Sequence, residues 1–233
     1  MLENGAETHR VEDTMIRMAK ACGVEHAESY ATPTAILFSL KIGDDPETQM
    51  ARIVKRKTDL KIISDVNRLS RELSEGKRTP REAFFLMKEL EKTSRPYPAF
   101  VQLTASALAS ACFSFMFGGA YPDCGAALFS GGIGYLMFLV MEKWSDVRFF
   151  SEFFSSMVIG LLSIFFIRIG IGTDLEKIIV GSVMPLVPGL LITNAIRDLM
   201  AGHLVSGLTK GAEALLTAFA IGSGVAFILL FFN

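Results

Sequence analysis

Charge is scarce in the second part of this sequence. Residues 97–233 carry only 6 of the 23 Lys and Arg residues and 8 of the 24 Asp and Glu residues. A stretch so poor in charge, rich in Leu, Ile, Phe, Val, Ala and Gly, is typical of chain surrounded by lipid. Residues 1–96 hold the other 17 basic and 16 acidic side chains. The sequence therefore predicts a soluble domain over residues 1–96 and a membrane domain over residues 97–233.

Other absences narrow the function. The three cysteines, Cys22, Cys112 and Cys124, have neither the spacing of a metal site nor that of a disulfide framework. The formal net charge is −1, and without a clustered basic excess we expect no nucleic-acid surface. No Ser/His/Asp set, phosphate-binding loop or HExxH motif is recognisable, so we expect no enzyme chemistry, no metal and no cofactor. The N-terminus has no apolar core of a signal peptide, so we expect no cleaved signal.

The first 96 residues predict a small α+β domain. Apolar residues recur at helical spacing in Thr8–Cys22 and in Asp59–Glu75. Thr79, Pro80 and Glu82 form a capping box with proline at the first helical position, so a third helix begins there. Three short segments favour strands: Glu25–Ser29, Ala35–Lys41 and Met50–Arg56.

His9 lies close to Glu12 and Asp13 in the sequence. Such a group could form a metal site or an acid/base cluster. The start of a helix also favours acidic residues, because the helix dipole is positive there. We therefore interpret these residues as a solvated first turn.

Residues 97–233 contain five segments close to the roughly 20 apolar residues that a helix needs to cross a bilayer. The fourth segment is interrupted by Pro185 and by Pro188-Gly189, which remove backbone donors and break the helix. Thr173 and Glu176 form a capping box near its start. The predicted membrane domain is all-α and polytopic, with about five transmembrane helices, the fourth broken. The segments are Phe100–Gly119, Ala126–Met141, Phe149–Ile169, Ile178–Ile196 and Ala214–Phe232.

Polar residues follow the broken segment. Asn194 and Asp198 are four residues apart, and Asn194 and Arg197 are three apart, so a helix puts them on one face. Ionisable groups at membrane depth usually mark a path for substrate or protons, and broken helices often line such sites. We predict that Arg197, Asn194 and Thr193 bind substrate and that Asp198 or Glu213 couples transport to protons. The alternative is that Arg197 and Asp198 end a helix at the membrane interface.

Several runs of residues carry a resemblance to a known family. The most specific run is Pro188-Gly189, Asn194-Ala195-Ile196-Arg197-Asp198, Gly202, Gly207 and Glu213-Ala214. The weaker ones are His9-Arg10-Val11-Glu12, Thr32-Pro33-Thr34, and Phe117-Gly118-Gly119 with Asp123. Together they resemble the threonine/serine exporter family over nearly the whole chain. His203 departs from the family pattern, in which an acidic residue follows this glycine.

The resemblance implies secondary export across a bacterial inner membrane, of threonine and serine in some members and of succinate in others. The family includes long single chains and split versions, in which a larger and a smaller membrane protein act together. This chain resembles the larger half. We therefore predict a subunit of a proton-motive-force-driven exporter of small carboxylates, with a small membrane partner.

Two other classes stay open. One is a membrane-anchored enzyme with a hydrolase-like head, and the other is a scaffold subunit that does not itself transport. Pairs of small residues at i and i+4 are frequent, for example Ala105 with Ala109 and Gly207 with Gly211. They indicate a helix bundle or a homo-oligomer rather than a particular chemistry.

Loop charges favour a cytoplasmic N-terminal domain. The first loop, Ala120–Asp123, contains no Lys or Arg. The second carries Lys143 and Arg148, and the fourth carries Arg197 and Lys210. The basic loops and the N-terminal domain are therefore expected on the inner side.

We expect a reporter fused after Asn233 to lie in the periplasm and one fused before Met1 to lie in the cytoplasm, because five spans carry the chain from one side to the other. Fusions to alkaline phosphatase, active in the periplasm, and to green fluorescent protein, fluorescent in the cytoplasm, measure the side of each end. A cytoplasmic C-terminus would contradict the five-span model and leave four or six spans.

Overall fold

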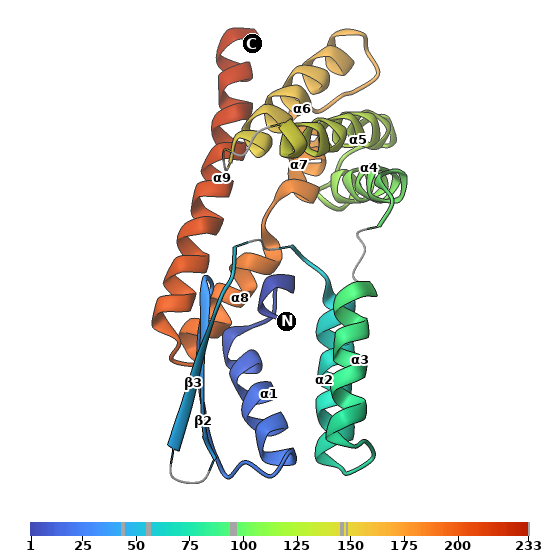
Figure 1. Ribbon diagram of the computed structural model, residues 1–233. Coiled ribbons are helices and arrows are strands. Elements are labelled where there is room, and N and C mark those ends of the chain that lie inside the picture. The colour runs from blue at the N-terminus through green and yellow to red at the C-terminus, as the bar shows by residue number, and fades with distance from the viewer. Residues whose placement is uncertain (43–44, 55–56, 94–96, 145–146, 148, 233) are drawn as a thin grey trace. The chain divides into compact units, whose positions relative to one another are not determined.

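The computed structural model describes residues 1–42, 45–54, 57–93, 97–144, 147 and 149–232 (Figure 1). Contacts within the chain divide it into two compact units. The first comprises Met1–Pro96 and Gly189–Glu213, and the second comprises Tyr97–Pro188 and Ala214–Asn233. The segment with the predicted transport residues thus packs with the N-terminal residues. Arg148, used above for orientation, lies outside the described residues.

The first unit combines helices with an antiparallel sheet of order β1-β2-β3. Ile42 pairs with Asp45, so β3 begins at Asp45 rather than at the predicted Met50. Pairing with β2, which sequence composition does not report, decides where this strand begins. The last two residues of the predicted strand, 55 and 56, lie outside the described residues. The elements are η1 (Leu2–Asn4), α1 (Thr8–Ala21), β1 (His26–Thr32), β2 (Ala35–Ile42), β3 (Asp45–Arg52), α2 (Leu60–Ser74), α3 (Pro80–Thr93), α8 (Gly189–Met200) and residues 204–213 of α9 (Leu204–Phe232).

The apolar faces of α1 and α2 form the core of the first unit. One buried group joins Leu2, Ala6, Val11, Ala31 and Ile63 and the second joins Leu69, Leu73 and Ala83. Helix α1 packs on β1 and on α2, and α2 packs on α3. Of the apolar residues predicted at helical spacing, Val11, Val66, Leu69 and Leu73 are buried, whereas Cys22, just beyond the end of α1, is exposed.

Four helices among the described residues are long and apolar enough to cross a membrane. They are α4 (Ala99–Met116), α5 (Tyr121–Trp144), α6 (Phe150–Arg168) and α9. A fifth candidate is the bent pair made of α7 (Leu175–Val183) with η2 (Met184–Leu186) and then α8. Pro185 lies in η2, Val187 is extended, and α8 begins at Gly189 directly after Pro188. The chain is thus mostly helical, with four or five candidate spans.

Small residues allow close helix packing in the second unit. A Cβ added at Gly181 of α7 would lie 2.7 Å from the Cβ of Ser114 on α4. A Cβ at Gly131 of α5 would lie 2.0 Å from the Oγ of Ser110 on α4. Because lipid gives helices no hydrophobic reason to associate, such close contacts hold a membrane bundle together. These glycines and serines therefore serve helix packing within the second unit.

A buried carboxylate fixes the start of α7. The Asp123 carboxylate accepts hydrogen bonds from the backbone N–H of Thr173 at 2.6 Å and of Asp174 at 3.0 Å, and from the Thr173 hydroxyl. The capping residue of α7 is Asp174, whose side chain accepts from the N–H of Lys177 at 3.3 Å. The helix start that the sequence predicts near Asp174 is therefore confirmed. The capping side chain is that of Asp174 and not of Thr173, because the Thr173 hydroxyl is hydrogen-bonded to Asp123.

The cap of α2 offers a test of local stability. The Asp59 carboxylate accepts from the N–H of Lys61 at 3.1 Å and of Ile62 at 3.2 Å. We expect Asp59→Ala to cost about 1 kcal/mol, so the amides of the first turn should exchange with deuterium about fivefold faster. Hydrogen-exchange mass spectrometry of the full chain measures this, with Asp65→Ala as the control in the middle of the same helix. Equal exchange in both variants would show that the cap contributes nothing.

Candidate functional site

Helix α8 has two different faces. Asn194, Ala195 and Asp198 are buried, whereas Thr193 and Arg197 are exposed. Four-residue spacing therefore groups Asn194 with Asp198 on the buried face and Thr193 with Arg197 on the exposed one. The Asn194 side chain donates to the carbonyl oxygen of Gly5 at 2.8 Å. The five predicted site residues thus do not form one group.

The buried face of α8 caps the start of α1. Asp198 has no exposed surface, and its carboxylate accepts hydrogen bonds from the backbone N–H of Thr8 at 2.9 Å and from the Thr8 hydroxyl at 2.8 Å. Thr8 is the first residue of α1, where backbone N–H groups have no partner within the helix and the helix dipole is positive. An aspartate distant in sequence thus serves as the N-terminal cap of this helix.

Lys210 neutralises the buried aspartate. Its ammonium group lies 2.7 Å from Oδ2 of Asp198 and also donates to the carbonyl oxygen of Ala6 and the hydroxyl of Thr8, both at 3.3 Å. Lys210 is only 5% exposed. A buried charge without a partner is very unfavourable, so the pair and its hydrogen bonds account for the burial of both groups. Sequence reasoning treated Lys210 only as a loop charge and missed this role.

A tight turn between α8 and α9 brings the pair together. Gly202 has φ +86°, a left-handed conformation that glycine adopts without strain. A Cβ added at Gly207 of α9 would lie 2.6 Å from Leu199 and 2.9 Å from the carbonyl oxygen of Ala195 on α8. The two glycines of the motif thus let α9 run back close to α8, which places Lys210 beside Asp198.

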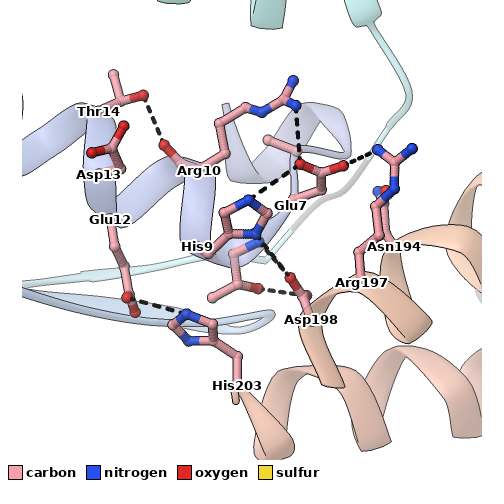
Figure 2. Close-up of polar contacts among 12 residues, drawn as sticks. Glu7, His9, Arg10, Glu12, Asp13, Thr14, Asn194, Arg197, Asp198 and His203 are labelled. Carbon is pink, nitrogen blue, oxygen red and sulfur yellow. Dashed lines mark hydrogen bonds and ion pairs between the residues drawn. The ribbon is translucent and has the colours of Figure 1, made fainter. Parts of the chain in front are cut away.

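The exposed face of α8 meets the N-terminal segment at Glu7 (Figure 2). Arg197 donates to one oxygen of the Glu7 carboxylate, and Arg10 lies 3.1 Å from the other. Burial alone would raise the pKa of Glu7, but the hydrogen bond from Arg197 and the charges of Arg10, Arg197 and His9 lower it below its usual range. Glu7 therefore stabilises the fold above the pKa of the unfolded chain, and this contribution is lost as the pH falls through the lower folded value.

Two histidines lie between carboxylates (Figure 2). The His9 and His203 rings stack with centroids 6.5 Å apart. Nδ1 of His9 is buried and lies 4.0 Å from Asp198, whereas Nε2 of His203 lies 3.7 Å from Glu12. The other Glu12 oxygen accepts from the N–H of Ala31 at 2.7 Å.

The interpretation of this segment as a solvated first turn is therefore wrong for Glu12, whose side chain is only 14% exposed and lies beside His203. His9 keeps a 42% exposed side chain. Asp13, by contrast, is exposed and pairs with Arg17. Among the described residues, no group of three or more His, Cys, Asp or Glu could hold a metal ion.

The other two predicted residues are Thr193 and Glu213. Thr193 is exposed, and its hydroxyl donates to the carbonyl oxygen of Gly189 at 2.9 Å, within its own helix. Glu213 is half-buried on α9, three residues after Lys210. We use the name ionic cluster for five residues: Glu7, Thr8, Arg197, Asp198 and Lys210.

Comparison with known proteins identifies the family. The family model described as "Putative threonine/serine exporter" matches residues 1–232. The chain belongs to the threonine/serine exporter family. The run of residues from Pro188-Gly189 to Glu213-Ala214, on which the resemblance mainly rests, falls inside the match. The chain is therefore a multi-pass membrane protein of a transporter family.

Three relatives of this family are similar along almost the whole chain. A Mycobacterium tuberculosis protein named "Probable threonine/serine exporter" is 23% identical over 227 residues, which cover 97% of this chain and 43% of the relative. The "Probable succinate transporter subunit YjjP" of Klebsiella aerogenes is 24% identical, covering 97% and 87%. The protein of the same name from Escherichia coli K12 is 23% identical, covering 98% and 89%. This chain thus spans less than half of the first relative. No solved structure matches it at a comparable level.

The buried pair predicts a large effect of removing one charge. Lys210→Met would leave Asp198 buried without its cation, so we expect a loss of about 3–5 kcal/mol in stability. The double variant with Asp198→Asn should recover part of that loss. Thermal unfolding of the purified full chain in detergent measures both.

The matched control is Lys177→Met, which removes an exposed lysine 2.9 Å from Asp174. An exposed pair contributes about 1 kcal/mol or less, so this variant should unfold close to the wild type. If Lys210→Met were no less stable than Lys177→Met, Asp198 and Lys210 would not be a coupled buried pair.

Proposed function

We propose that this chain is one subunit of a secondary exporter of small carboxylate metabolites, driven by the proton motive force. The observation that carries the proposal is the ionic cluster, in which a buried carboxylate and an exposed arginine follow each other on α8. The family membership supports export, and the names of the relatives support threonine and serine or succinate as substrates.

Asp198 has the properties of a proton-coupling carboxylate. It is fully buried, and its countercharge is Lys210 rather than solvent. Protonation of Asp198 would remove the attraction that holds Lys210 and weaken the bonds to Thr8, so the start of α9 and the start of α1 would be free to separate. Glu213, one turn further along α9, is the second candidate for the proton carrier.

The exposed face of α8 would bind the substrate. The Arg197 side chain is 56% exposed, and Thr193 lies one turn before it on the same face. A guanidinium group can hold a carboxylate by two parallel hydrogen bonds, and a hydroxyl can add a neutral one. Asn194, bound to the carbonyl of Gly5, would support this face from behind rather than contact the substrate.

The break before α8 would let the site move. Pro185 and Pro188 interrupt the helical hydrogen bonds, and α8 starts anew at Gly189. Carbonyl groups freed at such a break need partners from protein, substrate or water, which is the usual surrounding of a transport path. We propose this break as the hinge of the transport cycle.

The length and composition of α9 support the proposed placement in the membrane. Residues 214–232 contain no charged side chain and would extend about 28 Å as a helix, close to the thickness of the hydrocarbon layer. Lys210 and Glu213 would then lie at one end of this span. We propose a bacterial inner-membrane location with the α+β domain, residues 1–96, in the cytoplasm.

A small membrane partner would complete the exporter. The chain covers under half of the long Mycobacterium tuberculosis relative, and two relatives of similar length are named subunits. We therefore expect no export by this chain alone and export when a small membrane protein of the same family is co-expressed. Full export by the chain alone would contradict the two-subunit proposal.

Transport assays of the two-subunit exporter test the roles of the cluster. Arg197→Lys keeps the charge but not the planar pair of donors, so we expect export to fall about tenfold. Of Asp198→Asn and Glu213→Gln, one should abolish export coupled to the pH gradient and the other only reduce it. Efflux of labelled threonine and succinate from cells gives the rates.

The control is Arg168→Lys, at the end of α6, where the arginine donates to the carbonyl oxygen of Phe232 at 2.8 Å. It should export normally at equal protein levels. Normal export by Arg197→Lys, Asp198→Asn and Glu213→Gln would show that the cluster only ends a helix at the membrane interface. Substrate binding to the isolated chain would distinguish a transporting subunit from a scaffold.

A further inference from the structure

We infer that Arg10 and Arg197 together form the site that binds the carboxylate of the substrate. In this structure the Glu7 side chain occupies that site and competes with the substrate for it. The inference rests on the proposed function. It adds Arg10 to the substrate-binding residues and Glu7 as a competing side chain, and neither residue belongs to α8. The ligand class is a carboxylate, whether it belongs to an amino acid or to a dicarboxylate.

A single carboxylate bridges the two arginines. Arg197 contacts Oε1 of Glu7, and Nη2 of Arg10 lies 3.1 Å from Oε2 (Figure 2). Each guanidinium carries five N–H donors, so these contacts use only a small part of what the two side chains can donate. The two arginines, one from α1 and one from α8, are thus already placed around a carboxylate group.

Exposure differs between the arginines and the glutamate. The side chains of Arg10 and Arg197 are 45% and 56% exposed, whereas that of Glu7 is 7% exposed. A ligand in solution can therefore reach both guanidinium groups, although Glu7 itself is covered.

The charges around the two buried carboxylates favour an added anion. Glu7 contacts Arg10 and Arg197, and Asp198 contacts Lys210, so these contacts join three cations to two carboxylates. His9, which faces both carboxylates at 3.6 and 4.0 Å, can only add positive charge. A ligand carboxylate at the two arginines would be attracted by these cations, whereas Glu12 pairs with His203 at 3.7 Å.

Exchange of Glu7 for a ligand leaves no buried charge without a partner. If a ligand carboxylate takes the donors of Arg197, Glu7 still has Arg10 at 3.1 Å and His9 at 3.6 Å. Removing the last partner of a buried carboxylate would be very unfavourable, but removing one of several is not. The ligand and Glu7 therefore compete for Arg197, while Arg10 can contact both.

Removing the competitor should strengthen binding. For Glu7→Gln we expect L-threonine and succinate to bind the purified full chain about fivefold more tightly, because the charged competitor for Arg197 is gone. Arg10→Gln and Arg197→Gln should each weaken binding about tenfold. L-threoninamide, which has no carboxylate, should bind none of these proteins. Isothermal titration calorimetry in detergent measures the binding of each ligand to the wild type and to the three variants.

The matched control is Asp13→Asn, which removes the acidic member of the exposed Arg17–Asp13 pair on the same helix. It should bind like the wild type. If Glu7→Gln is poorly folded, Glu7→Asp replaces it, because the shorter side chain cannot reach both guanidinium groups and should also strengthen binding.

Two results would overturn the inference. In the first, Glu7→Gln binds the ligands as Asp13→Asn does. In the second, its binding is weakened as much as that of Arg197→Gln, which would mean that Glu7 only holds the arginine in place. The export assay separates this failure from failure of the proposed function. Wild-type export without tighter binding by Glu7→Gln removes only the inference. Tighter binding without export by the two-subunit complex removes the proposed function.

Discussion

The first unit depends on one buried carboxylate. Asp198 joins three segments, because its oxygens accept from the backbone and hydroxyl of Thr8 on α1 and from Lys210 on α9, while Asp198 itself belongs to α8. A buried carboxylate is tolerated only when its charge is balanced and its lone pairs are used. The start of α1 supplies Thr8 as a partner. The turn at Gly202 and the close approach of α9 to α8 bring Lys210 to the same carboxylate, so these three features depend on one another.

The second unit contains a carboxylate held in a different way. Asp123 accepts from the N–H groups of Thr173 and Asp174 and from its own loop at Ala120, all neutral donors near the starts of α5 and α7. Neutral donors fix the loop that leads into α7, whereas the charged partner of Asp198 is the cation Lys210, whose attraction to the carboxylate would be lost if Asp198 were protonated. This contrast is the physical reason for assigning the proton-coupling role to Asp198 and a structural one to Asp123.

Helix α8 places two kinds of chemistry on two neighbouring faces. Its buried face carries Asn194 and Asp198, bound to the N-terminal segment, and its exposed face carries Thr193 and Arg197. Arg197 nevertheless touches the same segment through Glu7, one residue before the Thr8 that Asp198 holds. A change of partner at Arg197 would therefore act on the chain next to the Asp198–Lys210 pair, which would connect the proposed carboxylate binding with the proposed proton binding.

The sequence by itself determined the apolar helices, the break between Pro185 and Gly189, the capping box that Thr79 and Glu82 form at the start of α3, and the family. These depend on periodicity, on missing backbone donors and on neighbours within a turn, all of which are local. Only the tertiary structure decided the partners of the charged groups. Thr8 and Asp198 are 190 positions apart, and Glu7 and Arg197 likewise. Which cation neutralises a buried acid depends on which segments pack together, and spacing along the chain does not contain that information.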